Sequence, residues 1–170
     1  MAIKAADVKK LRDATGAGMM DAKKALTEAD GDFDKAVDLL RVAGQAKAAK
    51  RSDREAANGL VVGAGNALVQ IGSETDFVAK NADFVATADK IAKAVDAAKA
   101  DSKDAAAQVQ LDDGKTVAQT LEDLAGTIGE KIELADAAYF EGNTHIYLHR
   151  RSQDLPPQVG VMAVSYTHLR

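Results

Sequence analysis

Apolar residues recur at intervals of three and four in three short stretches at the start of the chain. Residues 6–14, 19–29 and 33–44 each place apolar side chains on one face and charged side chains on the opposite face. This spacing is typical of amphipathic helices. Glycines between the stretches, as in residues 15–18, favour turns. The pattern therefore predicts a compact three-helix module over residues 1–44, close to the smallest size that folds independently.

The segment that follows, residues 45–57, is rich in alanine and in basic side chains. Gly44 precedes it, and we expect this glycine to end the third helix. Because alanine and lysine both favour helix, the segment is predicted to be a charged helical linker. Its basic residues are Lys47, Lys50, Arg51 and Arg54.

After residue 57, short strand-like apolar runs alternate with helical stretches. Strands are predicted at 59–64, 67–71, 132–140, 144–148 and 159–164, and helices at 83–99 and 117–128. Gly65 and Asn66 are typical of a two-residue hairpin turn. Strands separated by helices and joined by hairpins predict an α+β core with a small antiparallel sheet and packed helices. We place a first core subdomain at 58–140 and the start of a second at 141–164.

One strand-to-helix corner, Ser73–Asn81, contains residues with competing preferences. Thr75 is suited to cap the start of a helix, and Asp76 suits the positive end of the helix dipole. Phe77 follows this carboxylate directly, and burial of its large apolar side chain is favourable. Two interpretations are open: Phe77 packs beneath its own helix, or a partner protein buries it.

Composition limits the classes of protein to which the chain can belong. The 170 residues include no cysteine, which excludes disulfides and thiolate chemistry and fits a reducing compartment. No apolar run approaches the roughly 18 residues of a membrane span, and the first residues do not resemble a signal peptide. We therefore expect a cytoplasmic protein without a membrane partner.

Charge is unevenly distributed along the chain. The formal charge is −4, with a balance of +2 over residues 1–57 and −6 over the remainder. A net negative charge argues against a general nucleic-acid binder. The contrast between the two parts predicts two units with different surfaces.

Two sequence patterns resemble chemical sites, and neither meets the requirements of the chemistry. The Gly-Lys-Thr sequence at 114–116 matches the end of a phosphate-binding loop, but Val109 stands where that loop requires glycine. His145 and His149 fall on one face of a strand, but two histidines without a third ligand make a weak metal site. We therefore predict no catalytic residue, cofactor or metal site, and no enzyme.

Two segments carry motifs that can be compared with known families. Leu11–Leu26 has the sequence LRDATGAGMMDAKKAL, and Glu74–Asn81 has the sequence ETDFVAKN. They resemble the two signatures of the translation elongation factor Ts family, in the same order and at a similar separation. The Ala29–Asp32 segment between the second and third predicted helices also matches. The resemblance extends from about residue 2 to about residue 164.

The resemblance implies a ubiquitin-associated-like three-helix module, a helical linker and an α+β core. It also implies guanine-nucleotide exchange on the GTPase EF-Tu, in which GDP leaves faster so that GTP can enter. The expected partner is EF-Tu in its GDP-bound and nucleotide-free forms, with no cofactor and no direct nucleic-acid contact.

The resemblance further implies which residues contact the GTPase. Asp76 and Phe77 would form a wedge that disturbs the Mg²⁺ site, within the segment Thr75–Val78. His149 would be a further contact from the core. The contacts from the small module would be Arg12, Met19, Met20 and Lys23.

The two adjacent methionines also have a structural interpretation, in which one of them belongs to the core. Adjacent helical positions lie about 100° apart, so a module this small is not expected to bury both Met19 and Met20. An exposed methionine adapts its shape to a partner surface and is a credible contact.

The chain departs from the family pattern at several positions. Ala22 and Ser73 stand where cysteine is frequent, and we expect these small residues to preserve the packing. Gln70 and Gly72 stand where Glu and Asn are usual, which predicts a looser strand before the corner. Residues 165–170 look foreign to the family, so we expect a C-terminally truncated chain whose last strand lacks a neighbour.

Two other functions are open at the level of sequence. The three-helix module could bind ubiquitin-like surfaces without catalysis, and the core would then be only structural. Alternatively, the basic linker Lys47–Arg54 could contact RNA, although it is short and lacks interleaved aromatic residues.

Overall fold

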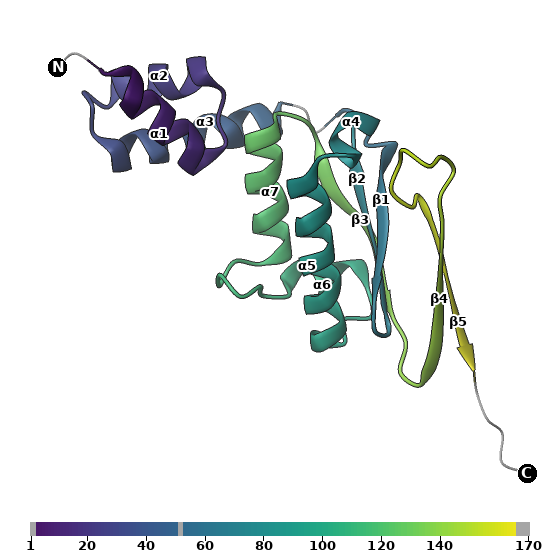
Figure 1. The fold of residues 1–170 in the computed structure, drawn as a ribbon. Helices are drawn as coiled ribbons and strands as arrows, with labels where there is room; N and C mark the ends of the chain where they lie inside the picture. Colours follow the sequence, from purple (N-terminus) through teal and green to yellow (C-terminus); the bar gives the residue numbers. More distant parts are fainter. Residues whose placement is uncertain (1–2, 51–52, 166–170) are drawn as a thin grey trace, which may run out of the picture. The chain divides into compact units, whose positions relative to one another are not determined.

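The computed structural model describes residues 3–50 and 53–165. The chain divides into two compact units, Met1–Asp53 with Glu122–Glu130, and Arg54–Leu121 with Lys131–Arg170. The fold is α+β as predicted, since three helices come first and further helices and antiparallel strands follow (Figure 1). Within the described residues, no helix is both long and apolar enough to cross a membrane. The subdomain boundaries predicted at residues 44, 57 and 140 stay predictions.

The first unit is built around the three predicted helices, α1 (Ala5–Thr15), α2 (Met19–Glu28) and α3 (Phe33–Ala49). Most of the buried residues at the contacts between the helices are alanines, whose small side chains let the helices approach closely. The buried core comprises Val8, Leu11, Ala22, Ala25, Leu26, Ala29 and Ala36. Ala22 is fully buried, so the small residue at this position fits the packing as predicted.

The third helix runs past the position at which it was predicted to end. Gly44 lies inside α3, which continues to Ala49. The prediction was wrong because one glycine costs a helix only about 1 kcal/mol relative to alanine, and the residues after it are good helix formers. Residues 45–49 of the predicted linker are therefore the last part of α3. At the other end of this helix, Asp32 Oδ1 accepts a hydrogen bond from Lys35 N at 3.1 Å and so caps the helix start.

The second unit contains a three-stranded antiparallel sheet. Its strands are, in spatial order, β1 (Asn58–Ala64), β2 (Ala67–Ser73) and β3 (Ile132–Tyr139). The two-residue turn predicted between the first two strands is confirmed, because Ala64 pairs with Ala67. The pairing of β2 with β3 shifts register between Gln70 and Ile71, in the strand for which looser structure was predicted.

Four helices accompany this sheet in the sequence. They are α4 (Asp76–Ala79), α5 (Ala82–Ala98), α6 (Lys103–Gln108) and α7 (Val117–Ile128). Helix α5 packs on β1 and β2. The predicted helical spacing is confirmed by its buried residues, Phe84, Ala88, Ile91, Ala92 and Val95. Ala98 continues the same spacing but is exposed, since it is the last residue of the helix.

The last two strands, β4 (Asn143–His149) and β5 (Val159–Ser165), form a separate two-stranded antiparallel sheet. The prediction that the last strand lacks a neighbour is wrong for one edge, because β5 pairs with β4 over its whole length, but no further strand of the described residues pairs with its other edge. Of the predicted foreign tail, Ser165 ends β5, and residues 166–170 lie outside the described residues.

Both faces of the three-stranded sheet are covered within the second unit. Figure 1 shows α5 on one side of the sheet and the β4–β5 hairpin on the other. The hairpin approaches closely, since a Cβ added at Gly160 would lie 2.6 Å from a methyl carbon of Val61. Cover on both sides explains why four consecutive residues of β1, Gly59–Val62, are all buried.

Candidate partner-binding site

The predicted corner folds as one helical turn, α4, between β2 and α5. Its inner side is formed by Val78 and Ala79, which are 6% and 0% exposed. Its outer side carries Phe77, which is 78% exposed. The interpretation that Phe77 packs beneath its own helix is therefore wrong. The interpretation that a partner buries this side chain is the one that the exposure favours.

A carboxylate and a cation flank the exposed ring. Asp76 begins α4, and its side chain is 44% exposed. The Nζ of Lys80 lies 3.7 Å from Asp76 Oδ2 and 6.0 Å from the centre of the Phe77 ring. Exposed ion pairs contribute little to stability, so a docking protein can replace these contacts at little cost.

The first residues of the two helices at the corner, α4 and α5, are capped differently from the prediction. Thr75 occupies the N-cap position of α4 with extended backbone, as predicted, but its side chain makes no cap hydrogen bond. The fully buried Ser73 instead donates from Oγ to the carbonyl of Thr75 at 2.9 Å. Asn81 starts α5 separately, because its Oδ1 accepts from Asp83 N at 2.8 Å. Asparagine is among the strongest N-cap residues, and this was the sequence signal for a break between two helices.

Glu74, for which the sequence predicted no role, joins the corner to distant parts of the second unit. Its Oε2 accepts from Arg54 Nη1 at 3.0 Å, and its Oε1 accepts from Lys131 N at 2.6 Å. Its carbonyl oxygen accepts from Asn58 Nδ2 at 2.8 Å. Local sequence carries no signal for these contacts, because Arg54 and Lys131 are 20 and 57 residues away.

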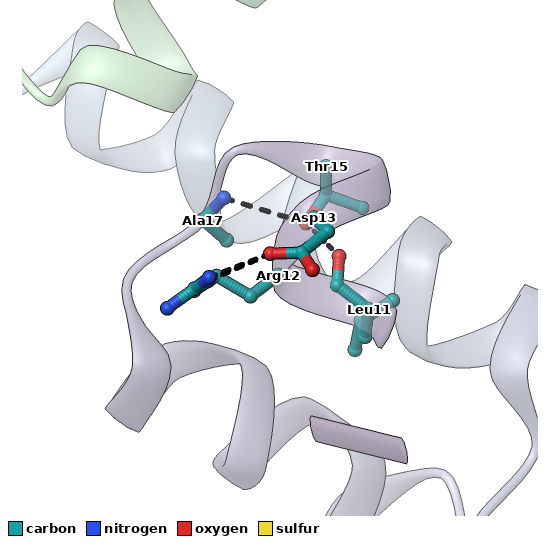
Figure 2. Close-up of polar contacts among 5 residues, drawn as sticks. All are labelled: Leu11, Arg12, Asp13, Thr15 and Ala17. Atoms are coloured by element: carbon teal, nitrogen blue, oxygen red, sulfur yellow. Dashed lines mark hydrogen bonds and ion pairs between the residues drawn. The ribbon is translucent and has the colours of Figure 1, made fainter. Parts of the chain in front are cut away.

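In the first unit, hydrogen bonds shape the turn that leads into α2 (Figure 2). Thr15 Oγ1 donates to the carbonyl of Leu11 at 2.6 Å and accepts from Ala17 N at 3.4 Å. Arg12, a predicted contact residue, forms an ion pair with the adjacent Asp13 at 2.7 Å, and its side chain is 41% exposed. The guanidinium therefore lies at the surface near this turn.

The start of α2 presents apolar and basic side chains together. Met19 and Met20 are 47% and 77% exposed, so neither is a core residue of the described module. Lys23 is also exposed, whereas Ala22 beside it is buried. Because residues three and four apart are neighbours on a helix surface, Lys23 lies next to both methionines. We call Arg12, Met19, Met20 and Lys23 the module patch.

The outer face of the β4–β5 hairpin is a third exposed surface. Alternate residues of both strands are exposed, and His145, Tyr147 and His149 share this face. Tyr147 pairs across the strands with Val161, and His149 pairs with Val159. The Tyr147 hydroxyl oxygen lies 3.2 Å from His149 Nδ1. The exposed apolar members of this face, Val159 and Val161, were not predicted, although the alternation along both strands was a signal for them.

The patterns that resembled chemical sites have structural explanations. Thr116 N donates to Gln119 Oε1 at 3.0 Å, and Gln119 N donates back to Thr116 Oγ1 at 3.2 Å. The Gly-Lys-Thr sequence therefore ends in the reciprocal capping box of α7. In the part of the chain that the structure describes, no group of three or more His, Cys, Asp or Glu residues is placed to hold a metal ion.

These features define an α+β protein that begins with a three-helix module and presents exposed apolar side chains on short, well-anchored elements. A family model described as Elongation factor TS matches residues 74–168, which include α4 to α7, strand β3 and the β4–β5 hairpin. The chain belongs to the elongation factor Ts family.

Curated relatives extend the similarity through the three-helix module. Elongation factor Ts of Cutibacterium acnes is 76% identical over 162 residues, which cover 95% of this chain and 60% of the relative. Elongation factor Ts of Nocardioides sp. is 58% identical over 161 residues, covering 94% of this chain and 59% of the relative. That of Mycolicibacterium gilvum is 56% identical over 163 residues, covering 96% and 59%. The chain thus spans about 60% of the length of these relatives.

Proposed function

We propose that this chain is a guanine-nucleotide exchange factor of translation elongation that binds EF-Tu carrying GDP and promotes GDP release. The observation that carries the proposal is the 78% exposure of Phe77 on a helical turn whose next two residues are buried. Membership of the elongation factor Ts family supports it. The proposed activity consists of binding and displacement, with no bond made or broken, so the chain would not act as an enzyme.

In this mechanism, the Phe77 ring inserts into the GTPase surface near the Mg²⁺ ion that bridges protein and phosphate. Mg²⁺ requires nearly ideal octahedral geometry from its oxygen ligands. An inserted ring that shifts the groups orienting those ligands weakens the metal and the nucleotide together. Because Val78 and Ala79 are buried, the helical turn is held in place by its own protein. Insertion of Phe77 therefore displaces groups of the GTPase and not the turn.

Thermodynamic linkage sets the order of events. A factor that weakens GDP binding must itself bind most tightly to the nucleotide-free GTPase, because the coupling between two ligands is reciprocal. Entry of GTP then weakens the hold of the factor and releases it. The proposed partner states are therefore EF-Tu with GDP and EF-Tu without nucleotide.

The module patch and His149 have a different proposed role, which is to hold the GTPase while the wedge acts. Methionine side chains are flexible and polarizable and fit irregular surfaces, so Met19 and Met20 suit a docking contact. His149 lies on the exposed face of the hairpin and offers a polar contact from the core. Loss of these residues should weaken affinity more than the rate of release from the complex.

Release of fluorescently labelled GDP from EF-Tu, followed by stopped flow, tests the proposal. The chain should accelerate release in a concentration-dependent and saturable way. Full-length Elongation factor Ts of Cutibacterium acnes is the positive control. If the chain is folded by circular dichroism and does not accelerate release, the proposal is wrong.

The same preparation separates the two other functions that the sequence left open. An RNA-associated factor would shift RNA in a gel, with an affinity that falls steeply with salt. A ubiquitin-binding module would bind a ubiquitin-like domain in a calorimetric titration. Under the proposal, EF-Tu binds and neither of these ligands does. Cell fractionation should place the chain in the cytoplasm, the proposed place of action.

A further inference from the structure

The side chain of Glu74 is nine-tenths buried although it belongs to a charged residue type. Burial of a carboxylate is costly unless it is paired and hydrogen-bonded. Both of its oxygens are satisfied, one by the guanidinium of Arg54 and the other by the backbone N–H of Lys131. A charge-assisted bond of 2.6 Å to a backbone donor fixes the carboxylate in position.

Glu74 directly follows β2, and its partners come from both sides of that strand. Asn58 is the first residue of β1, Arg54 lies in the segment that leads into β1, and Lys131 lies directly before β3. These two strands are the neighbours of β2 in the sheet. Lys131 Nζ also donates to the carbonyl of Arg54 at 2.9 Å, which closes the network. Glu74 is therefore tied to both neighbouring strands where the chain leaves the sheet.

The helical turn beyond this point is too short to fix its own direction. Helix α4 has four residues and no side-chain cap hydrogen bond at its start. An isolated helix of one turn is not stable in water. Its direction depends on the two buried residues beneath it and on the position of the residues that precede it. Glu74 is separated from Asp76 and Phe77 by Thr75 alone.

We propose that Glu74 is a positioning residue for nucleotide exchange. It holds the Asp76–Phe77 turn in the orientation that presents the Phe77 ring to the GTPase. This inference rests on the function proposed above. With a side chain only 10% exposed, Glu74 acts through the turn and not by direct contact with the GTPase. Its loss should therefore impair insertion of the wedge and leave docking through the module patch intact.

Amide hydrogen exchange in the free protein is the first test. In Glu74→Ala, the backbone N–H groups of Lys80 and Asn81, which bond to α4 carbonyls, should exchange about tenfold faster or more. A hydrogen bond to a charged acceptor contributes at least about that factor to an equilibrium. In Glu74→Gln, amide hydrogen exchange should stay within about threefold of the wild type, because the amide oxygen still accepts from Lys131 N although the bond from Arg54 is lost.

Glu141→Gln is the matched control. Glu141 is an acidic residue of the same unit that pairs with Lys99 at 2.6 Å, outside the network around Glu74. This variant should leave the exchange at Lys80 and Asn81 unchanged. The amides that pair β2 with β3 should stay protected in all variants, which separates a local effect from global unfolding.

GDP release measured against chain concentration is the second test. Glu74→Ala should lower the maximal release rate about tenfold while the concentration for half-maximal effect changes less than about threefold. Glu74→Gln should restore most of the maximal rate. A merely structural role would reduce activity only in proportion to the folded fraction and would show no such split.

Each outcome decides the inference. Unchanged amide hydrogen exchange at Lys80 and Asn81 in Glu74→Ala would overturn the inference that Glu74 positions the turn. Faster amide hydrogen exchange with an unchanged maximal rate of GDP release would overturn the positioning role of Glu74. The proposed nucleotide-exchange function of the chain would still stand. A wild-type chain that does not accelerate GDP release refutes the proposed function, and the proposed role of Glu74 in nucleotide exchange is then refuted as well. If Glu74→Ala does not fold, Arg54→Met removes one partner alone and must give an intermediate effect at both readouts, or the inference fails.

Discussion

Phe77 and Val78 are consecutive residues of one helical turn, yet Phe77 is 78% exposed and Val78 is 6% exposed. Adjacent helical positions point about 100° apart, so burial of Val78 against the sheet directs Phe77 away from it. The exposure of the ring thus follows from the way in which α4 is anchored. This relationship makes the function of Phe77 separable from its contribution to folding.

Phe77→Ala should leave the melting temperature nearly unchanged, because little buried area is lost. It should slow stimulated GDP release about tenfold or more, since burying a large apolar side chain in a partner contributes about 1.5–3 kcal/mol. A loss of about 1.4 kcal/mol from the transition state is about tenfold in rate. Thermal unfolding and stopped-flow release on the same sample check both expectations.

Phe84→Ala is the matched control for this substitution. Phe84 is 1% exposed and belongs to the face of α5 that packs on the sheet. Its truncation should cost about 3–5 kcal/mol of stability and reduce activity only through the folded fraction. A large stability loss in Phe77→Ala with normal release per folded molecule would remove Phe77 from the mechanism.

The double substitution Met19→Ala with Met20→Ala should lower affinity for EF-Tu and leave the helix content of the module intact. Both side chains are exposed, so their loss creates no cavity in the described core. Calorimetric titration measures the affinity, and circular dichroism measures the helix content. Leu26→Ala is the contrasting variant, because Leu26 is 1% exposed and its truncation should cost about 2–5 kcal/mol of stability. Unchanged affinity in the double variant would contradict the docking role.

Asp76→Ala should slow stimulated release, and the extent of slowing should depend on the Mg²⁺ concentration. The reason is that the proposed wedge brings this carboxylate near the ligands of the metal ion, where charge acts strongly. Release rates measured over a series of Mg²⁺ concentrations check the expectation. Lys80→Met is the control, because it removes the ion pair with Asp76 while leaving the carboxylate. Equal slowing at all Mg²⁺ concentrations would contradict a role near the metal.

The Lys99–Glu141 pair predicts a pH dependence that NMR can detect. The hydrogen bond from Lys99 Nζ, and then the positive charge of Lys99, lower the pKa of Glu141. The same hydrogen bond, and then the negative charge of Glu141, raise the pKa of Lys99. A carboxyl group with a lowered pKa stabilises the fold above its unfolded-state pKa, and this contribution is lost as the pH falls through its folded pKa. The contribution from Lys99 has the opposite sign and is lost as the pH rises through the raised pKa of the amine.

In an NMR titration, the pKa of the Glu141 carboxyl should therefore be lower than that of an ordinary glutamate. Lys99→Met should move its pKa back toward that range, and Lys90→Met, which removes a cation elsewhere on α5, should not. Both members of the pair are well exposed, so the effect on overall stability should be small. An ordinary pKa for Glu141 in the wild-type chain would show that the pair does not form in solution.

Much of the fold follows from local patterns in the sequence. Helical periodicity was sufficient for the three helices of the module and for the buried face of α5, and Gly65-Asn66 was sufficient for the first hairpin. These features depend on residues close together in the chain, so a short window contains the information. The motifs Leu11–Leu26 and Glu74–Asn81 likewise identified the family without any knowledge of the fold.

The tertiary structure decided the features that depend on distant residues. Whether Phe77 points inward or outward was open until Val78 and Ala79 were found beneath the turn, against strands of the same sheet. Glu74 acquires its position from Arg54 and Lys131, which only folding brings to it. The pairing of β5 with β4 also joins segments separated by a loop without a short turn signal. Burial and long-range hydrogen bonds depend on which surfaces meet in space, and no local pattern of apolar and polar residues encodes that.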